Sequence, residues 1–230
     1  YQNIMFLAAG EVTEAVAGVS WDEWIATRIL GPLGMTRSNT SHADLAAASN
    51  VAMPHAIVND EVMAIPYRDI DNVAPAGSIH SSARDMTRWL RVLLGEGTID
   101  GRRVLPEGVV AEMFVPHTLR PVDTLSARLF PSPHFSAYGL GGGLRDYGGR
   151  MVVAHTGGID GMLSMVTLVP EEELGIVVLT NTSPNTAYNP IVYHILDSYL
   201  GLPSQDWPAV YRELDRRTAD EHARAHDTVD

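Results

Sequence analysis

The chain has 230 residues, of which 45% are hydrophobic, so it can bury a full core or two modest lobes and is not a disordered chain. Its formal net charge of -12 excludes a nucleic-acid-binding protein, because binding a phosphate backbone needs concentrated positive charge. All sixteen basic residues are arginine, and the absence of cysteine excludes a thiolate nucleophile, a Cys-based metal site and a disulfide.

The first 137 residues predict helices joined by loops. Apolar residues recur at helical spacing over Ile4–Ala17, and no apolar run in the chain reaches membrane-spanning length. Ser20 with Glu23 forms a capping box that begins a helix over Trp21–Leu30. We further expect a helix stop at 31–34, loops over 36–74, a helix over 84–94 capped by Ser82, a helix from Pro106 to Phe114, and a loop over 116–133.

The remaining residues predict strands followed by a helix. Met151–Ala154 is typical of a buried strand, and Met162–Val169 with Gly175–Thr180 predicts an antiparallel hairpin whose turn contains Pro170. Helical spacing returns over Tyr188–Leu200, and a charged helical tail follows. This order indicates an α+β fold rather than repeated βαβ units. We expect a mostly helical lobe over 1–137, a sheet with its closing helix over 138–201, and a helical tail or connector over 202–230.

Two tripeptides are candidates for the catalytic site. Tyr1-Gln2-Asn3 lies at the head of a helix, and His155-Thr156-Gly157 follows a buried strand and precedes the hairpin. With these motifs the chain resembles the penicillin-recognising serine hydrolases, especially class C β-lactamase-like esterases and D-aminopeptidases. That family carries S-x-x-K, then Y-x-N, then K-T-G or H-x-G. The resemblance covers roughly Tyr1 to Gly201. It implies a β-lactamase/transpeptidase-like fold, an antiparallel sheet flanked by helices, whose N-terminal part lies outside this chain.

The resemblance implies roles for the first motif and for the histidine. Tyr1 would shuttle protons between the nucleophile and the leaving group, and Asn3 would hydrogen-bond the acyl part of the substrate. His155, standing where many members have lysine, would supply an N–H donor opposite Tyr1. Because a neutral imidazole is a weaker partner for a carboxylate than an ammonium ion, we expect esters or peptides rather than penicillins as substrates. The alternatives are a core tyrosine, a plain helix N-cap and an ordinary strand-end histidine.

The residues after His155 would contact the substrate. By the same resemblance Thr156 and Gly157 bind substrate, and the backbone N–H of Gly158 completes the oxyanion hole. Gly157 lets the strand approach the substrate closely, since a side chain there would obstruct it. A simple Gly-Gly turn is the alternative.

The absence of lysine bears on the nucleophile. The S-x-x-K motif cannot lie in a chain without lysine, so we expect the nucleophilic serine on an upstream segment and expect this chain alone to be inert. The predicted function is a serine acyl hydrolase that forms an acyl-enzyme with an ester, an amide or D-peptide, or a β-lactam. The alternative is a catalytically inactive scaffold that binds peptides or a protein partner.

Neither a metal nor a cofactor is expected. His222 and His226 are four residues apart, but the sequence between them lacks the glutamate of H-E-x-x-H, and the segment is charged like a solvated helix face. The glycines of 139–143 lack phosphate-loop spacing and a lysine, which argues against a nucleotide site.

Overall fold

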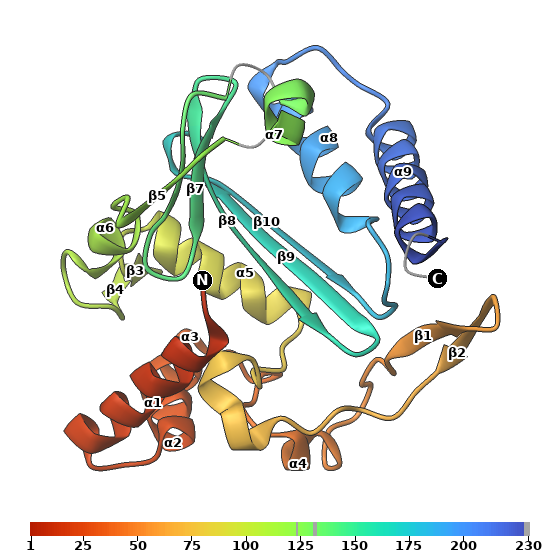
Figure 1. Cartoon of the computed structure of the whole chain (residues 1–230). Coiled ribbons are helices and arrows are strands. Elements are labelled where there is room, and N and C mark those ends of the chain that lie inside the picture. The colour runs from red at the N-terminus through yellow and green to blue at the C-terminus, as the bar shows by residue number, and fades with distance from the viewer. Residues whose placement is uncertain (123, 131–132, 228–230) are drawn as a thin grey trace. The chain divides into compact units, whose positions relative to one another are not determined.

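The computed structural model describes residues 1–122, 124–130 and 133–227, with the side chains of 124, 125 and 219–227 outside that description. Its contacts divide the chain into two compact units, Tyr1–Ser183 and Pro184–Asp230 (Figure 1). The predicted three-part domain division stays a prediction. Among the described residues no single helix is long and apolar enough to cross a membrane, and Asn3–Ala17 with Trp21–Leu33 reach that length together only with a bend of 79°.

The first helices follow the sequence pattern closely. Helix α1 spans Asn3–Ala17 and ends where Gly18 turns left-handed with φ 69°. Helix α2, Trp21–Ile25, is capped by Ser20, whose Oγ accepts the Glu23 N–H at 3.1 Å. The helix runs past the predicted end at Leu30, because π-helical η1 (Ala26–Leu30) continues into α3 (Gly31–Leu33), and it ends at left-handed Gly34, inside the predicted stop at 31–34.

The prediction of loops over 36–74 is wrong in part. This stretch contains a short helix, α4 (His42–Leu45), and a hairpin of β1 (His55–Val58) and β2 (Glu61–Ala64). Asn59 and Asp60 both adopt positive φ at the hairpin tip, as the favoured two-residue turn requires. Every residue of β2 is exposed, so no alternation of apolar and polar residues marked it as a strand. A 3-10 segment, η2 (Asp71–Ala76), follows.

Helix α5 (Ala83–Leu94) buries one face, with Leu90, Val92 and Leu93, and confirms its prediction. The Ser82 Oγ accepts the Asp85 N–H at 3.2 Å, which is the predicted cap. Two short strands, β3 (Thr98–Ile99) and β4 (Arg102–Arg103), form a hairpin after it. Helix α6 spans only Val109–Met113, later than predicted from Pro106, because Gly108 at its N-cap is left-handed with φ 79°.

A six-stranded sheet in the order β10-β9-β8-β7-β6-β5 forms the centre of the first unit. All neighbouring strands pair antiparallel, which confirms the predicted α+β class. The predicted loop over 116–133 is wrong where β5 and a short helix α7 (Thr124–Leu129) form, while residues 123, 131 and 132 lie outside the described residues. The strands are β5 Thr118–Arg120, β6 Ser136–Tyr138, β7 Gly143–Tyr147, β8 Arg150–Ile159, β9 Met162–Val169 and β10 Leu174–Thr180.

The hairpin of β9 and β10 confirms the prediction, with the 3-10 turn η3 (Pro170–Glu172) between the strands. Strand β8, by contrast, is longer than the predicted Met151–Ala154. It continues through the H-T-G motif to Ile159 because β9 pairs with it along that whole length. The motif therefore lies within a strand rather than after one.

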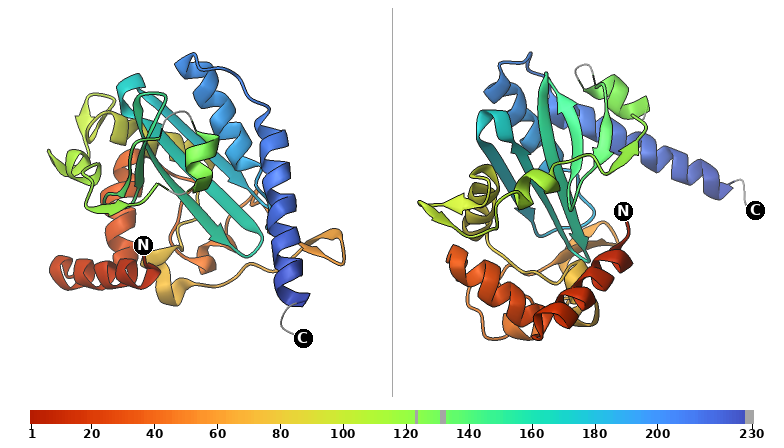
Figure 2. Two further views of the ribbon diagram at one scale, coloured as in Figure 1. Left: turned by 45° about the horizontal axis from the view of Figure 1, so that its top comes forward. Right: turned by 90° about the vertical axis from the view of Figure 1, so that its left-hand side faces the viewer.

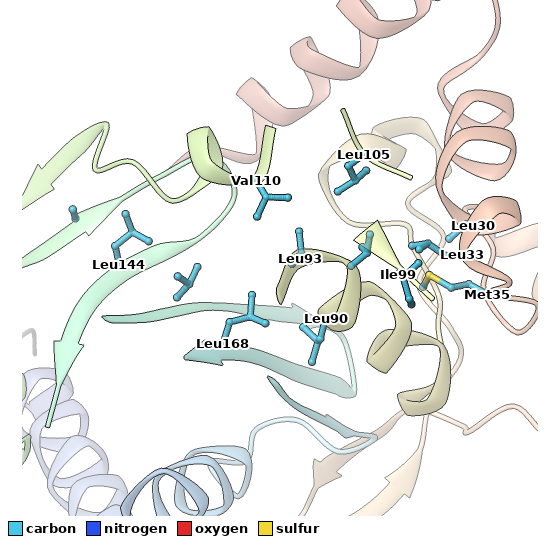
Figure 3. Close-up of a cluster of buried hydrophobic side chains, with 13 residues drawn as sticks. Leu30, Leu33, Met35, Leu90, Leu93, Ile99, Leu105, Val110, Leu144 and Leu168 are labelled. Carbon is cyan, nitrogen blue, oxygen red and sulfur yellow. The ribbon is translucent and has the colours of Figure 1, made fainter. Parts of the chain in front are cut away.

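The core lies between α5 and the sheet. Leu90 and Leu93 of α5 belong to one buried cluster with Leu144 of β7 and Leu168 of β9, all nearly or fully buried (Figure 3). A Cβ on Gly175 of β10 would stand 3.1 Å from the Leu90 Cβ, so glycine permits this close approach of helix and strand. Each buried leucine contributes about 1.5–3 kcal/mol from removing its apolar surface from water. This packing holds the sheet that carries His155.

The second unit is a pair of helices. Helix α8 spans Tyr188–Leu200, as predicted, and ends at left-handed Gly201. Helix α9 (Trp207–Asp227) confirms the predicted helical tail. Trp207 is fully buried, its Nε1–H donates to the Asp197 Oδ2 at 2.6 Å, and its ring lies 4.8 Å from that of Tyr193. This hydrogen bond and ring contact join the two helices.

Candidate active site

Tyr1 and Asn3 stand together at the start of α1. The Tyr1 hydroxyl donates to the Asn3 Oδ1 at 2.6 Å, and Tyr1 is 65% exposed, so none of the described residues buries it as a core tyrosine. The N-cap of α1 is Gln2, which makes no side-chain capping bond, so Asn3 is not the helix cap either. Both side chains are therefore available for another purpose.

Tyr1 and His155 come together although 153 residues separate them in the sequence. Their ring centroids lie 5.2 Å apart, within the range of direct aromatic contact. The N-terminus lies beside the sheet in both views of Figure 2. The sequence-based expectation that the phenol and the imidazole face one another agrees with this geometry.

The hydrogen bond of His155 fixes its tautomer. Its Nδ1 lies 2.7 Å from the backbone carbonyl oxygen of Thr156, and since a carbonyl only accepts, Nδ1 carries the proton. A neutral ring therefore presents an unprotonated Nε2. This refines the expected N–H donor role, because the Nε2 of His155 donates only when the ring is protonated and otherwise accepts.

The residues after Ala154 form an open strand edge. Strand β7 pairs with β8 only as far as Gly143 opposite Ala154, whereas β9 continues to pair through Ile159. Among the described residues, the stretch from His155 to Ile159 therefore has a strand neighbour on one side only. Thr156, Gly157 and Gly158 are exposed there. An unpaired strand edge presents backbone N–H and C=O groups to whatever lies beside it.

The two glycines of the motif lie in the strand, so the turn alternative is wrong; Gly161 makes the turn instead. A Cβ added to Gly157 would stand 2.5 Å from the Ser164 Oγ, and one added to Gly158 would stand 3.2 Å from the Leu163 Cδ2. Packing across to β9 therefore gives Gly157 a structural reason of its own, separate from the expected approach of the substrate.

Sequence reasoning missed two further residues beside this pair. The ring of Tyr138 on β6 lies 5.8 Å from Tyr1 and 6.0 Å from His155, both nearly edge-on. The Arg120 guanidinium of β5 lies over the Tyr138 ring at 5.8 Å. Gly143 makes room for it, since a Cβ there would stand 3.0 Å from the Arg120 Nη2. No motif marks either residue, and only the strand register could have found them.

A broad cleft of about 2200 Å³ contains this cluster. Its wall includes α1, the loop before α5, and β8 with β9. At its rim Arg68 pairs with Asp160 at 3.4 Å, and the Arg37 guanidinium is bound to the Ser49 carbonyl. Arg120 is thus the cleft arginine that borders the aromatic cluster of Tyr1, Tyr138 and His155.

The described residues contain no group of three or more His, Cys, Asp or Glu side chains that could hold a metal ion. His222 and His226 lie in the part of α9 whose side chains are outside the description, so the argument against a zinc site there stays a prediction.

The chain matches the family model described as Beta-lactamase over residues 1–199. It is 27% identical to "Unguisins hydrolase ungD'" of Aspergillus campestris over 236 residues, covering 99% of this chain and 42% of that protein. It is 28% identical to "Penicillin-binding protein 4" of Amycolatopsis lactamdurans, covering 82% of this chain and 48% of that protein.

Among solved structures, the octameric penicillin-binding protein homologue from Pyrococcus abyssi is similar with a TM-score of 0.77 and 25% identity. That likeness covers 93% of this chain and 45% of the other. The chain therefore spans less than half the length of each of these three relatives.

Proposed function

Because the chain belongs to the beta-lactamase family, within the penicillin-recognising serine hydrolases, we propose that it supplies the tyrosine and histidine of a serine acyl hydrolase site. The predicted β-lactamase/transpeptidase-like fold is confirmed by the same relatives, and the family is one of hydrolases. The nucleophilic serine and its lysine would lie on an S-x-x-K segment that precedes Tyr1 in a longer protein, since this chain has no lysine.

The contact of Tyr1 with His155 beside the open edge of β8 carries the proposal. The 5.2 Å ring separation allows one small acyl group to touch both side chains. The exposed edge from Thr156 to Gly158 lies next to them, so a carbonyl bound there could accept backbone N–H bonds. Gly158 is the proposed oxyanion donor, and Thr156 and Gly157 are the proposed substrate-binding residues.

In the proposed reaction the serine Oγ attacks the carbonyl carbon of an ester or amide. Its proton passes to Tyr1, acting as a phenolate base supported by the S-x-x-K lysine, and the electron pair of the C=O bond moves to the oxygen, held by backbone N–H groups. When that pair returns, the C–O or C–N bond to the leaving group breaks and Tyr1 protonates the leaving group. Water then attacks the acyl-enzyme by the same route and releases the acid.

Asn3 and His155 would orient this proton transfer. When Tyr1 is protonated its hydroxyl donates to Asn3 Oδ1, which leaves the Asn3 Nδ2 group to donate to the substrate. His155 would accept through Nε2 when neutral, or donate to a Tyr1 phenolate when protonated. With a neutral imidazole in place of a fixed ammonium ion, esters, amides and D-peptides are the favoured substrates, and β-lactams are less favoured.

Labelling of the full-length protein tests this proposal. We expect a fluorophosphonate or a fluorescent penicillin to modify one serine N-terminal to Tyr1, identified by mass spectrometry, and we expect the 230-residue chain alone to remain unlabelled. Tyr1→Phe should lower kcat/KM for a nitrophenyl ester by about 10²–10⁴-fold, the range of general acid–base catalysis. Tyr199→Phe, an exposed tyrosine of α8, is the matched control.

Two outcomes would contradict this proposal. One is a full-length protein with neither label nor ester hydrolysis, which would leave the inactive binding scaffold. The other is a labelled serine together with an unimpaired Tyr1→Phe variant, which would remove Tyr1 from the reaction.

A further inference from the structure

Among the described residues beside Tyr1 and His155, Tyr138 has a hydroxyl group that the proposed reaction does not yet use. Its hydroxyl oxygen is buried and makes no hydrogen bond to any described residue. A buried hydroxyl without a hydrogen-bond partner costs free energy, so its presence calls for an explanation. A partner that forms the hydrogen bond during the reaction would provide one. Its ring contacts both Tyr1 and His155, which places it at the junction of the proposed catalytic pair.

We propose that Tyr138 is a positioning residue for Tyr1 and His155, and that its hydroxyl donates a hydrogen bond to the Tyr1 oxygen when negative charge develops there. This inference rests on the proposed role of Tyr1 as the base. Three observations support it: the ring contact of Tyr138 with both partners, its buried and unpaired hydroxyl, and the guanidinium that lies over its ring.

The charges around Tyr138 favour donation in this direction. Among the described residues, the titratable and charged groups that face it are Tyr1 from α1, His155 from β8 and Arg120 from β5. Burial raises the pKa of Tyr138, negative charge on Tyr1 raises it further, and Arg120 opposes both. Tyr138 therefore keeps its proton, whereas Tyr1 is the more exposed phenol. In the proposed hydrogen bond, Tyr138 is the donor and the Tyr1 oxygen is the acceptor.

Arg120 has a supporting role. Its Nη2–H donates to the Ala137 carbonyl at 2.9 Å, next to Tyr138 in the chain, and this bond holds the guanidinium against the tyrosine ring. A fixed positive charge over the Tyr138 ring favours an arrangement in which negative charge develops on the oxygen that the Tyr138 hydroxyl contacts. Removing the charge while keeping a polar side chain, as in Arg120→Gln, should weaken the same effect more mildly than loss of the Tyr138 hydroxyl.

The test is the pH profile of kcat/KM for ester hydrolysis by the full-length protein. Tyr138→Phe keeps the ring and removes the hydroxyl. Because the phenolate of Tyr1 loses a donor, the acid limb of the profile should move up by about one pH unit. At any pH on the acid limb the corresponding loss in kcat/KM is about 10-fold, and it lies in kcat, while KM changes less than about 2-fold. Arg120→Gln should move the limb in the same direction by a smaller amount, and Arg120→Lys should restore most of it.

Tyr147→Phe is the matched control, because Tyr147 is a fully buried tyrosine on β7 of the same sheet, away from the cleft. It should lower thermal stability without moving the acid limb. An unmoved acid limb in Tyr138→Phe, in a protein where Tyr1→Phe abolishes turnover, would overturn the role of Tyr138 and leave the proposed function standing. Full activity in Tyr1→Phe would instead overturn the proposed function itself.

Discussion

Substitution of Gly157 by alanine separates packing from catalysis at the H-T-G motif. The added Cβ would stand 2.5 Å from the Ser164 Oγ but 3.8 Å from the Ser164 Cβ, so the conflict is with a single hydroxyl oxygen. Overpacking costs about 1–3 kcal/mol, and the lower end applies because the hydroxyl can rotate away. Against this, alanine gains about 0.4–1 kcal/mol by restricting the unfolded chain. We expect Gly157→Ala to lower the free energy of unfolding by about 1 kcal/mol at most.

Ser164→Ala removes the conflicting atom, so the same substitution should change sign in that background. Gly157→Ala should then be neutral or raise the free energy of unfolding by up to about 1 kcal/mol. Denaturant unfolding of the two single variants, the double variant and the wild type measures the coupling. If Gly157→Ala is equally destabilising with and without the Ser164 hydroxyl, the contact is not the cause.

The rate of ester hydrolysis is the second quantity to measure on the same four proteins. If Gly157 also lets the edge of β8 approach the substrate, the double variant should regain stability but not ester hydrolysis. Recovery of both would mean that Gly157 serves packing alone, and the expected role in substrate approach would be wrong.

Four further substitutions test the packing and charge of the fold. Leu33→Ala should lower the free energy of unfolding by about 2–5 kcal/mol, because Leu33 is fully buried in the core, and chemical denaturation measures it. Trp207→Phe should cost about 1.5–3 kcal/mol by removing the indole N–H that donates to buried Asp197, whereas Asp197→Asn, which keeps an acceptor, should cost less. Burial raises the pKa of Asp146, but hydrogen bonds from the His134 side chain and backbone outweigh it and lower that pKa below its usual range. The stability from Asp146 is thus present above the ordinary aspartate pKa and lost as pH falls through the lowered one, so thermal unfolding of Asp146→Asn should lack that loss.

The elements predicted well are those whose own residues determine them. Helix α5 has a serine cap and an apolar stripe that buries Leu90 and Leu93, and the β9–β10 hairpin has two apolar runs around Pro170. These signals are local, so they can be found without knowledge of the rest of the molecule.

The elements missed are those that depend on pairing at a distance. Strands β2 and β5 are exposed along their whole length, so they lack the alternation that marks a strand, and their partners define them. The length of β8 was underestimated for the same reason, since Gly157 and Gly158 have low strand propensity and extend the strand only because β9 continues beside them.

The residues of the candidate site also fall into those that the sequence could identify and those that it could not. Tyr1, Asn3 and His155 lie in short motifs and could be named from the sequence, together with their expected proximity. Tyr138 and Arg120 reach the same place through the register of β5, β6 and β7, in which Tyr138 faces Gly143 and Gly143 faces Ala154. Such a chain of cross-strand neighbours is a property of the folded sheet and has no signature in a single sequence.

A double-mutant cycle on Tyr1 and His155 in the full-length protein tests most directly whether they act on one acyl group. Residues that act as a unit lose their effects together, so Tyr1→Phe with His155→Gln should lower kcat/KM for an ester little more than Tyr1→Phe alone. Independent losses that multiply in the double variant, or no loss on either substitution, would contradict a shared site.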